Sequence, residues 1–199
     1  MIKKTAAAIS LLIMAMLVFN TIAVADEKQP SDEEIMAIYM KYAAPGDNHK
    51  IFDAMIGSWD AVARWWGDPA APPSESKATS ECKWILGGRF IQDDVTGEAG
   101  GMPFHGLGIT GYDNYKKQYI AYWFDEMATS CMTSIGSIDS TGKIITMGGT
   151  YEDMVSGKAK KFKSITRIVN NDQHIYEMYD YSDDGKEWKN FEVIYNRKK

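Results

Sequence analysis

The chain has 199 residues, of which 45% are hydrophobic and 25% are charged. This length and composition are typical of one packed domain, and they exclude wholesale disorder, collagen-like repeats and a multi-span membrane protein. The formal net charge of −5 argues against nucleic acid as a partner, because a nucleic-acid binder usually carries a basic face. Aromatic residues make up 12% of the chain, so the fold must house many large, rigid side chains.

Residues 1–25 have the three-part pattern of a secretory signal peptide. Lys3 and Lys4 form a basic start, an apolar run follows, and small residues precede Asp26. The apolar run is shorter than the ~20 residues that a spanning helix needs, which favours cleavage near Ala25 over an uncleaved anchor. The sequence therefore predicts a periplasmic or secreted protein with no transmembrane segment in its mature chain.

Residues 26–45 are expected to form a polar leader and a first helix. Ser31 and Glu34 have the spacing of a capping box. Asp47 is expected to cap a second short helix, which Gly57 ends. We expect the two helices to cover one end of the domain that follows. The first helix should present one apolar stripe, made of Ile35, Ile38, Tyr39 and Tyr42.

From Ser58 onward, short segments rich in β-branched and aromatic residues alternate with turn formers. The short connections force consecutive strands to pair as antiparallel neighbours, and closure of the sheet removes its exposed edges. We therefore predict an all-β, single up-and-down antiparallel barrel of about ten strands over residues 46–199. Such a barrel is wider than the ~8 strands that side chains fill by themselves, so its lumen holds a ligand or is crowded by large residues. The predicted strands are 58–66, 76–84, 88–96, 104–112, 117–125, 129–138, 143–151, 160–170, 173–181 and 187–196.

Several short strings occur along the chain in a specific order. They are Gly57-Ser58-Trp59, WILGGRF at 84–90, GMPFHGLG at 101–108, GYDN at 111–114, WFD at 123–125, Thr166-Arg167, EMYD at 177–180, DGKE at 184–187 and IYNR at 194–197. In this order they resemble the domain of unknown function 1579 (DUF1579) family, and the resemblance extends from about residue 45 onward. It implies an exported bacterial protein with a lipocalin-like, calycin-type barrel and no established activity. Cys82 and Cys131 depart from the family pattern.

Trp59 near the start of the first strand and Arg197 in the last strand resemble a pair found in lipocalin-type barrels. There, a first-strand tryptophan packs on an arginine of the final strand and seals the closed end. A guanidinium over an indole face contributes ~0.5–2 kcal/mol. The resemblance therefore assigns both residues a structural role. The alternative is an ordinary core tryptophan beside an unrelated arginine.

Export would place Cys82 and Cys131 in an oxidising compartment, where an even number of cysteines permits one disulfide. The alternative is two separate buried thiols that pack as small hydrophobic groups. A catalytic cysteine is poorly supported, because Lys83 is the only basic neighbour of either residue.

Period-two alternation places several charged residues on otherwise apolar strand faces. An ionic group on such a face must be paired or must await a ligand. One interpretation is a lumen in which an arginine meets a ligand carboxylate between aromatic walls. The other is an internal Arg–Glu network that pairs with itself. The candidate ligand-binding residues are Trp84, Arg89, Trp123, Asp125, Arg167, Glu177 and Tyr179.

His49, His105 and His174 do not have the spacing of a metal site, so no metal is predicted. His174 shares a strand face with Tyr176 and Met178, which is compatible with an axial haem ligand in an apolar lumen. A solvent-facing or hydrogen-bonded histidine is the commoner case. We predict no cofactor, and no nucleophile motif indicates an enzyme.

The leading functional hypothesis is a protein that binds a small hydrophobic or amphipathic molecule in its barrel. The first alternative is an envelope interaction or structural protein with a filled barrel, which bulky lumen side chains and exposed outer aromatics would mark. Haem binding is a further alternative. An enzyme would need a perturbed acid or histidine in a cleft with a partner within reach. The oligomeric state is not predicted.

Overall fold

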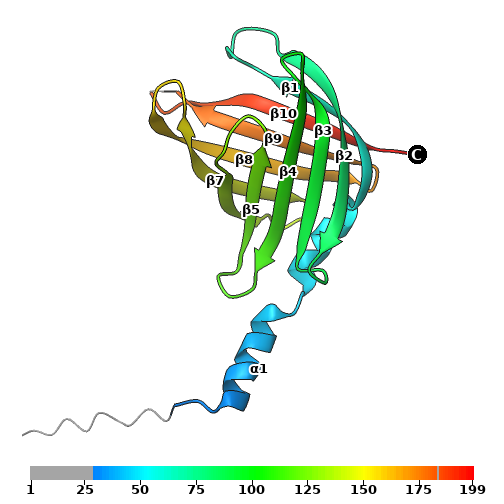
Figure 1. The fold of residues 1–199 in the computed structure, drawn as a ribbon, viewed down its shortest axis with the longest axis vertical. Helices are drawn as coiled ribbons and strands as arrows, with labels where there is room; N and C mark the ends of the chain where they lie inside the picture. Colours follow the sequence, from blue (N-terminus) through cyan, green and yellow to red (C-terminus); the bar gives the residue numbers. More distant parts are fainter. Residues whose placement is uncertain (1–28, 183) are drawn as a thin grey trace, which may run out of the picture.

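The structure is a computed structural model that describes residues 29–182 and 184–199; the predicted signal peptide lies outside the described residues. Ten antiparallel strands form a closed barrel in which each strand pairs with its neighbours in sequence and the last pairs with the first (Figure 1). This arrangement confirms the predicted fold. The strands are β1 (Gly57–Trp65), β2 (Ser74–Ile85), β3 (Phe90–Ala99), β4 (Met102–Asp113), β5 (Gln118–Asp125), β6 (Met132–Ile138), β7 (Ile144–Asp153), β8 (Lys158–Asn170), β9 (Gln173–Tyr181) and β10 (Glu187–Arg197).

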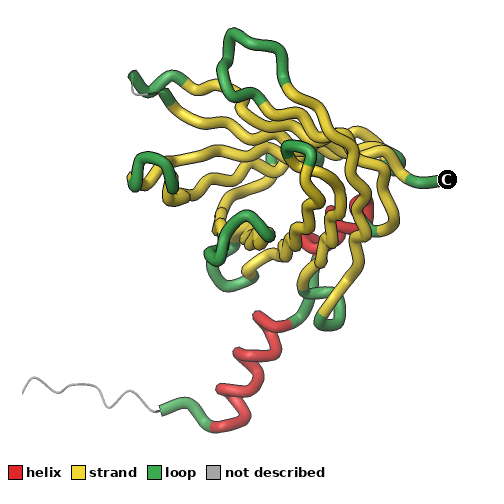
Figure 2. The backbone as a smooth tube through the Cα atoms, turned by 45° about the horizontal axis from the view of Figure 1, so that its top comes forward, coloured by secondary structure: helices red, strands yellow, loops and turns green. Residues whose placement is uncertain are grey.

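One end of the barrel, here called the closed end, is covered by the short 3₁₀-helix η1 (Asp47–Met55) (Figure 2). Phe52 of η1 is 0% exposed and its ring contacts Tyr119 of β5. The Tyr119 hydroxyl donates to the Asn48 carbonyl at 3.0 Å. Because turns alternate between the two ends of an up-and-down barrel, the β5–β6 and β9–β10 connections lie at the opposite end, here called the open end.

The first residues of η1 differ from the expectation for Asp47. Gly46 is the N-cap residue, and its backbone N–H donates to Nδ1 of His49 at 3.1 Å. Asp47 instead lies inside the first turn, where its carboxylate pairs with Lys50 at 2.7 Å. The histidine ring therefore accepts from the N-cap residue, and the N-cap bond expected from an aspartate side chain is not made, because Gly46 has no side chain.

The helix α1 (Asp32–Ala43) begins with the predicted capping box. The Glu34 backbone N–H donates to Ser31 Oγ at 3.2 Å, and the Ser31 N–H donates to Glu34 Oε2 at 2.7 Å. The helix does not cover the barrel, however. It extends away from the closed end and has no buried residue (Figures 1 and 2). The expected packing of its apolar stripe is wrong because η1 already occupies the end of the barrel.

The core fills the closed-end half of the lumen. Trp59 is 0% exposed, Tyr119 is 1% exposed and Ile91 is 2% exposed, and they belong to one cluster with Phe52 and Tyr195. This half of the lumen is therefore a packed hydrophobic interior of the usual kind.

Candidate functional site

The strand register decides which predicted residues face the lumen. Trp84 of β2 lies opposite Ile91 of β3, which is a buried core residue. Trp123 and Asp125 of β5 share the inward face of Tyr119, because side chains alternate along a strand. These three predicted residues are therefore on the inner wall of the barrel.

Trp84 lies at the closed end rather than in an open lumen. Its indole Nε1 donates to Asp53 Oδ1 of η1 at 3.2 Å, and its ring meets Phe52 edge-on. Arg89 is outside the lumen, in the β2–β3 turn, where its guanidinium donates to the Leu86 carbonyl at 3.0 Å. Both residues hold the closed end together, and the expectation that Arg89 meets a ligand carboxylate is corrected.

Arg167, Glu177 and Tyr179 project from the outer face of the barrel, so their assignment to the lumen is also corrected. Glu177 lies opposite Glu192 of β10, next to the buried, inward Val193. The ring of Tyr179 is covered by the ammonium group of Lys163 at 4.7 Å.

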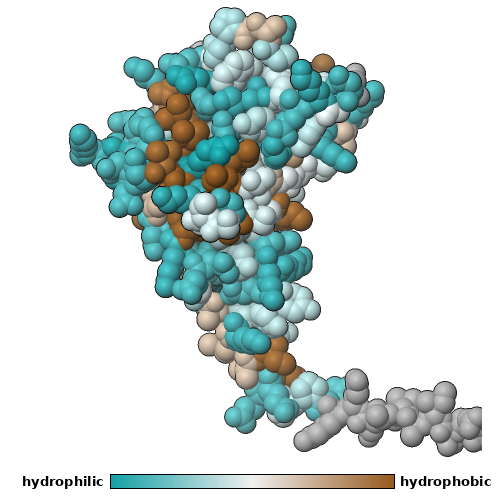
Figure 3. All heavy atoms as spheres, turned by 180° about the vertical axis from the view of Figure 1, so that it is seen from behind, coloured by the Kyte–Doolittle hydropathy of each residue, from teal (hydrophilic) through white to brown (hydrophobic). Residues whose placement is uncertain are grey.

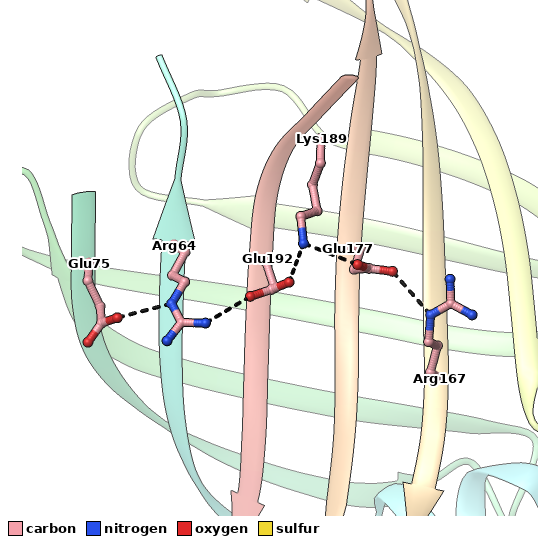
Figure 4. Close-up of polar contacts among 6 residues, drawn as sticks. All are labelled: Arg64, Glu75, Arg167, Glu177, Lys189 and Glu192. Carbon is pink, nitrogen blue, oxygen red and sulfur yellow. Dashed lines mark hydrogen bonds and ion pairs between the residues drawn. The ribbon is translucent and has the colours of Figure 1, made fainter. Parts of the chain in front are cut away.

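The charged side chains form a continuous band across five strands of the outer face (Figure 4). Arg64 pairs with Glu75 at 3.0 Å and with Glu192 at 3.2 Å. Glu177 accepts from Arg167 at 3.2 Å and from Lys189 at 3.3 Å, and Lys189 also contacts Glu192. Arginine and glutamate side chains therefore pair with each other as the second interpretation expected, but its internal location is wrong, because the pairs lie on the outer face. The alternation pattern placed these charged residues inside because their strand faces also carry apolar residues. Apolar residues lie on the outer surface too, where Figure 3 shows them gathered among hydrophilic ones.

The contact between Trp59 and Arg197 is present at the closed end. The guanidinium carbon lies 4.1 Å from the centre of the indole ring. Arg197 donates to the carbonyls of Ala54 at 3.0 Å, Ile56 at 2.7 Å and Asn171 at 2.6 Å. These bonds tie η1 and the β8–β9 turn to the last strand, which is a structural role.

His174 does not fit the haem alternative. Its ring is stacked on Tyr195 at 4.3 Å and meets Trp59 edge-on at 4.4 Å. Burial, with a smaller contribution from Arg197, lowers the pKa of His174 to about 4, so the ring is neutral near pH 7. An axial ligand must present a nitrogen to open space, whereas this ring is packed inside the closed-end core.

The other two histidines do not face the open-end half of the lumen. His49 caps η1, and His105 lies on the outer face of β4, 3.0 Å from Asp94. Within residues 29–182 and 184–199, no group of three His, Cys, Asp or Glu side chains could hold a metal ion.

The two cysteines are not bonded to each other. Cys82 is buried on β2 opposite Gly57 and Asp93, near the closed end. Cys131 is exposed and immediately precedes β6 at the open end. Of the two alternatives, the structure shows separate thiols, although only Cys82 is buried as that alternative expected. The barrel separates the two residues by much of its length. Burial raises the pKa of the Cys82 thiol, which makes it a poor nucleophile.

A polar cluster, here called the Asp180 cluster, consists of Tyr151, Asp180 and Asn190 in the half of the lumen nearer the open end. Asp180 lies opposite the buried Phe162, which identifies its face as the inner one. Asn190 Nδ2 donates to Asp180 Oδ2 at 2.7 Å, and the Tyr151 hydroxyl donates to the same oxygen at 3.2 Å. Burial raises the pKa of the Asp180 carboxyl, and burial with the nearby Asp180 charge raises the pKa of Tyr151 to about 12.

A β-bulge positions Asn190. The register shifts between Lys189 and Phe191, so Asn190 is an extra residue in β10. Bulges re-aim side chains and recur next to functional sites. Asn190 is 8% exposed, and its Oδ1 has no hydrogen-bond partner among the described residues.

The sequence pattern did not indicate any of the three members of the Asp180 cluster as site residues. Asp180 could have been found, because it continues the inward alternation of Tyr176 and Met178. The bulge at Asn190 has no comparable sequence signal, because it depends on the pairing of β10 with β9.

Comparison with known proteins agrees with the sequence resemblance. Residues 44–197 match the family model described as "Protein of unknown function (DUF1579)". The chain belongs to the DUF1579 family. No curated protein matches this DUF1579 chain.

Solved structures resemble the DUF1579 chain in fold. The crystal structure of Rv2717c from M. tuberculosis matches with a TM-score of 0.55 at 13% identity, over 78% of this chain and all of that one. A redesigned β-barrel matches with a TM-score of 0.39 at 11% identity, over 74% of this chain and 94% of the design. A DUF3598-family protein of unknown function from Nostoc punctiforme has a TM-score of 0.24 at 7% identity, over 77% of this chain and all of that one. Only the first is similar enough to support the fold.

The half of the DUF1579 barrel nearer the open end is aromatic and rich in hydrogen-bond acceptors. Trp123 donates to Asp125 Oδ2 at 2.8 Å, and its ring stacks with Phe104 at 6.4 Å. Asp153 forms an ion pair with Lys160 near the rim. No helix in the described part of the chain has the length and apolar character needed to cross a membrane.

Proposed function

We propose that this DUF1579 protein binds a small hydrophobic or amphipathic molecule in the open-end half of its lumen. The observation that carries the proposal is the contrast between the two halves. Inward residues near the closed end, such as Trp59 and Tyr119, are at most 1% exposed. Most inward residues nearer the open end, such as Trp123 and Met178, are only half-buried although they face the interior, and Val95 and Phe162 are the buried exceptions.

Residual accessibility inside a barrel supports space for a ligand between its walls. The aromatic residues of this half can cover an apolar chain, and its few polar groups can orient a head group. The filled-barrel alternative is less well supported, because it requires bulky packing through the whole lumen. The core cluster lies mainly in the closed-end half, and in the other half Val95 and Phe162 are buried while the other inward aromatic side chains are half-buried.

We also propose that the protein is exported, on the basis of residues 1–25. Cleavage after Ala25 would leave a mature chain of 174 residues that begins at Asp26. The denatured mass of the protein purified from its own host tests this proposal directly. A mass that retains residues 1–25 would contradict it.

Ligand binding can be tested by fluorescence titration with N-phenyl-1-naphthylamine, a neutral apolar probe, after the protein has been stripped of lipid. We expect saturable binding by the wild-type protein. Ala121→Trp should weaken it by at least about tenfold, because Ala121 is half-buried on the inward face of β5 and a large side chain there fills the lumen. The matched control is Tyr122→Trp at the adjacent, outward position, which is 39% exposed.

The control variant should bind the probe like wild type. Circular dichroism and thermal unfolding would check that both variants fold, and Ala121→Leu would replace the tryptophan variant if it does not. Absence of saturable binding by wild type would overturn the proposal. Equal binding by the inward and outward variants would also overturn it, because the probe would then lie outside the lumen.

A further inference from the structure

We infer that the Asp180 cluster receives the polar head of the ligand and that this head is a hydrogen-bond donor, an amine before an alcohol, rather than a carboxylate. The inference rests on the proposed function and specifies its ligand class. It follows from the orientation of Asn190, the charges that face the lumen and the rings beside the cluster.

Asn190 supplies an acceptor that the protein leaves unused. Its Nδ2 is committed to Asp180 at 2.7 Å, which fixes the amide so that Oδ1 is the free end. That oxygen is buried and has no partner within the described chain, and the residue is 8% exposed. Buried acceptors are nearly always satisfied, because an unmade bond leaves their desolvation uncompensated. A ligand N–H or O–H would satisfy Oδ1.

Asp180 adds a second acceptor at the same place. Its Oδ2 accepts from both Asn190 and Tyr151, while Oδ1 has a single longer contact of 3.3 Å with the Tyr151 hydroxyl. A carboxylate has about four acceptor positions. The cluster therefore offers two adjacent acceptor atoms, and both suit a donor group that carries more than one hydrogen.

The charges on the inner wall favour the same ligand class. Asp125, Asp153 and Asp180 occupy inward positions of the open-end half. Two lysines are also inward, Lys158 opposite Asp153 and Lys160 two residues further along β8, and Lys160 forms an ion pair with Asp153 and lies near Asp180. Three carboxylates against two ammonium groups leave this wall with one net negative charge, which favours a cationic head over an anionic one.

The arginines that could bind a carboxylate are all placed elsewhere. Arg64 and Arg167 belong to the charged band on the outer face. Arg89 is held in the β2–β3 turn and Arg197 seals the closed end. The sequence contains no other arginine. Bidentate recognition of a carboxylate by arginine is therefore not available in this half of the lumen.

Aromatic rings beside the cluster complete the match to an ammonium head. Trp188 lies opposite Asp180 in the register, and Tyr151 contributes its ring as well as its hydroxyl. Ring faces attract cations, more strongly when water is excluded. An alkylamine could thus place its ammonium group at the Asp180 cluster and its chain against Phe104 and Trp123.

The test is displacement of bound N-phenyl-1-naphthylamine at pH 7 by decylamine, decanol and decanoate, which share one chain length and differ in the head. We expect decylamine to displace the probe at a concentration about tenfold below that of decanoate, with decanol between them. Asp180→Asn should raise the decylamine concentration needed to displace the probe by about tenfold. The gap between the displacing concentrations of decylamine and decanoate should become smaller. Asp60→Asn is the matched control, because Asp60 is exposed on the outer face of β1 and should leave all three values unchanged.

A second variant keeps the inference testable if Asp180→Asn does not fold. Asn190→Leu removes the unused acceptor, together with the Nδ2 bond to Asp180, with little change in volume. It should raise the concentrations of decylamine and decanol needed to displace the probe, relative to that of decanoate. Displacement by decanoate at equal or lower concentration than decylamine would overturn the inference, as would an unchanged preference in either variant. Failure of the probe itself to bind would instead overturn the proposed function, so the two failures are distinguishable.

Discussion

Arg197 combines several roles in one side chain. Its guanidinium covers the face of Trp59 at 4.1 Å and donates to three backbone carbonyls. The position of the Arg197 guanidinium also explains why residue 57 is a glycine, whose φ is +128°. A Cβ at this position would lie 2.5 Å from Arg197 Nη1. The planar guanidinium, rather than positive charge alone, is what this site requires.

Arg197→Lys should therefore destabilise the protein by about 3 kcal/mol, because an ammonium group cannot keep the flat contact and the divided set of carbonyl bonds. Urea unfolding monitored by tryptophan fluorescence measures the change. The same substitution at Arg64, on the outer face, should cost less than about 1 kcal/mol, because exposed ion pairs contribute little. Equal losses in the two variants would contradict the structural role of Arg197.

His174 makes stability depend on pH. Its pKa in the folded protein is about 4, below the ordinary 6.5, because burial and Arg197 disfavour the charged ring. The unfolded chain therefore binds a proton that the folded chain does not, and stability falls as pH drops from about 6.5 toward 4. The loss from this residue amounts to about 3 kcal/mol.

The comparison that isolates His174 is His174→Phe against wild type. We expect the variant to lose less free energy of unfolding between pH 7 and pH 5, since it has no proton to gain at this position. Denaturant unfolding at the two pH values measures the difference. An identical loss in both proteins would show that His174 does not contribute.

At the scale of elements, α1 and η1 differ in what they bury. No residue of α1 is buried, and its end is held by Asn114 Nδ2, which donates to the carbonyls of Tyr42 at 2.9 Å and Ala44 at 2.8 Å. Phe52 of η1, by contrast, is fully buried in the core. The barrel should therefore depend on η1 and be nearly independent of α1.

Deletion of residues 26–43 should change the free energy of unfolding by less than about 1 kcal/mol, since no core contact is lost. Phe52→Ala should cost about 3–5 kcal/mol through the cavity it leaves under η1. Chemical denaturation of the two variants provides the measurement. A large loss on deletion of α1 would show that the helix packs against the folded protein.

The strands were predictable because their limits depend on local chemistry. Turn formers separate short β-rich segments, so the sequence alone predicts ten strands and their antiparallel order. The sequence could not predict that α1 leaves the barrel uncovered. An apolar helical stripe, here Ile35 and Tyr39, does not reveal whether another element already covers the barrel end.

The faces of the strands were harder to predict than their limits. Trp123 and Asp125 were correctly placed inside, since their neighbours alternate cleanly. Glu177 was misplaced because Ile175 and Tyr179, its companions on the face, also lie outside. Asn190 was missed because a bulge breaks the period-two rule at that residue.

At the scale of the whole molecule, the barrel is divided along its axis. The half near η1 is a packed core sealed by Trp59 and Arg197. The half nearer the open end has aromatic walls, half-buried inward side chains and the Asp180 cluster. The proposed binding site is in this second half, and the charged band lies on the outer face of the barrel.

The central claim is that this open-end half holds a small molecule. The most direct test is mass spectrometry of the protein purified from its own host, recorded under native and then denaturing conditions. We expect an additional mass in the native spectrum alone, from a molecule with an apolar chain and an amine or hydroxyl head. A native mass equal to that of the bare chain, together with no uptake of decylamine on addition, would contradict the claim.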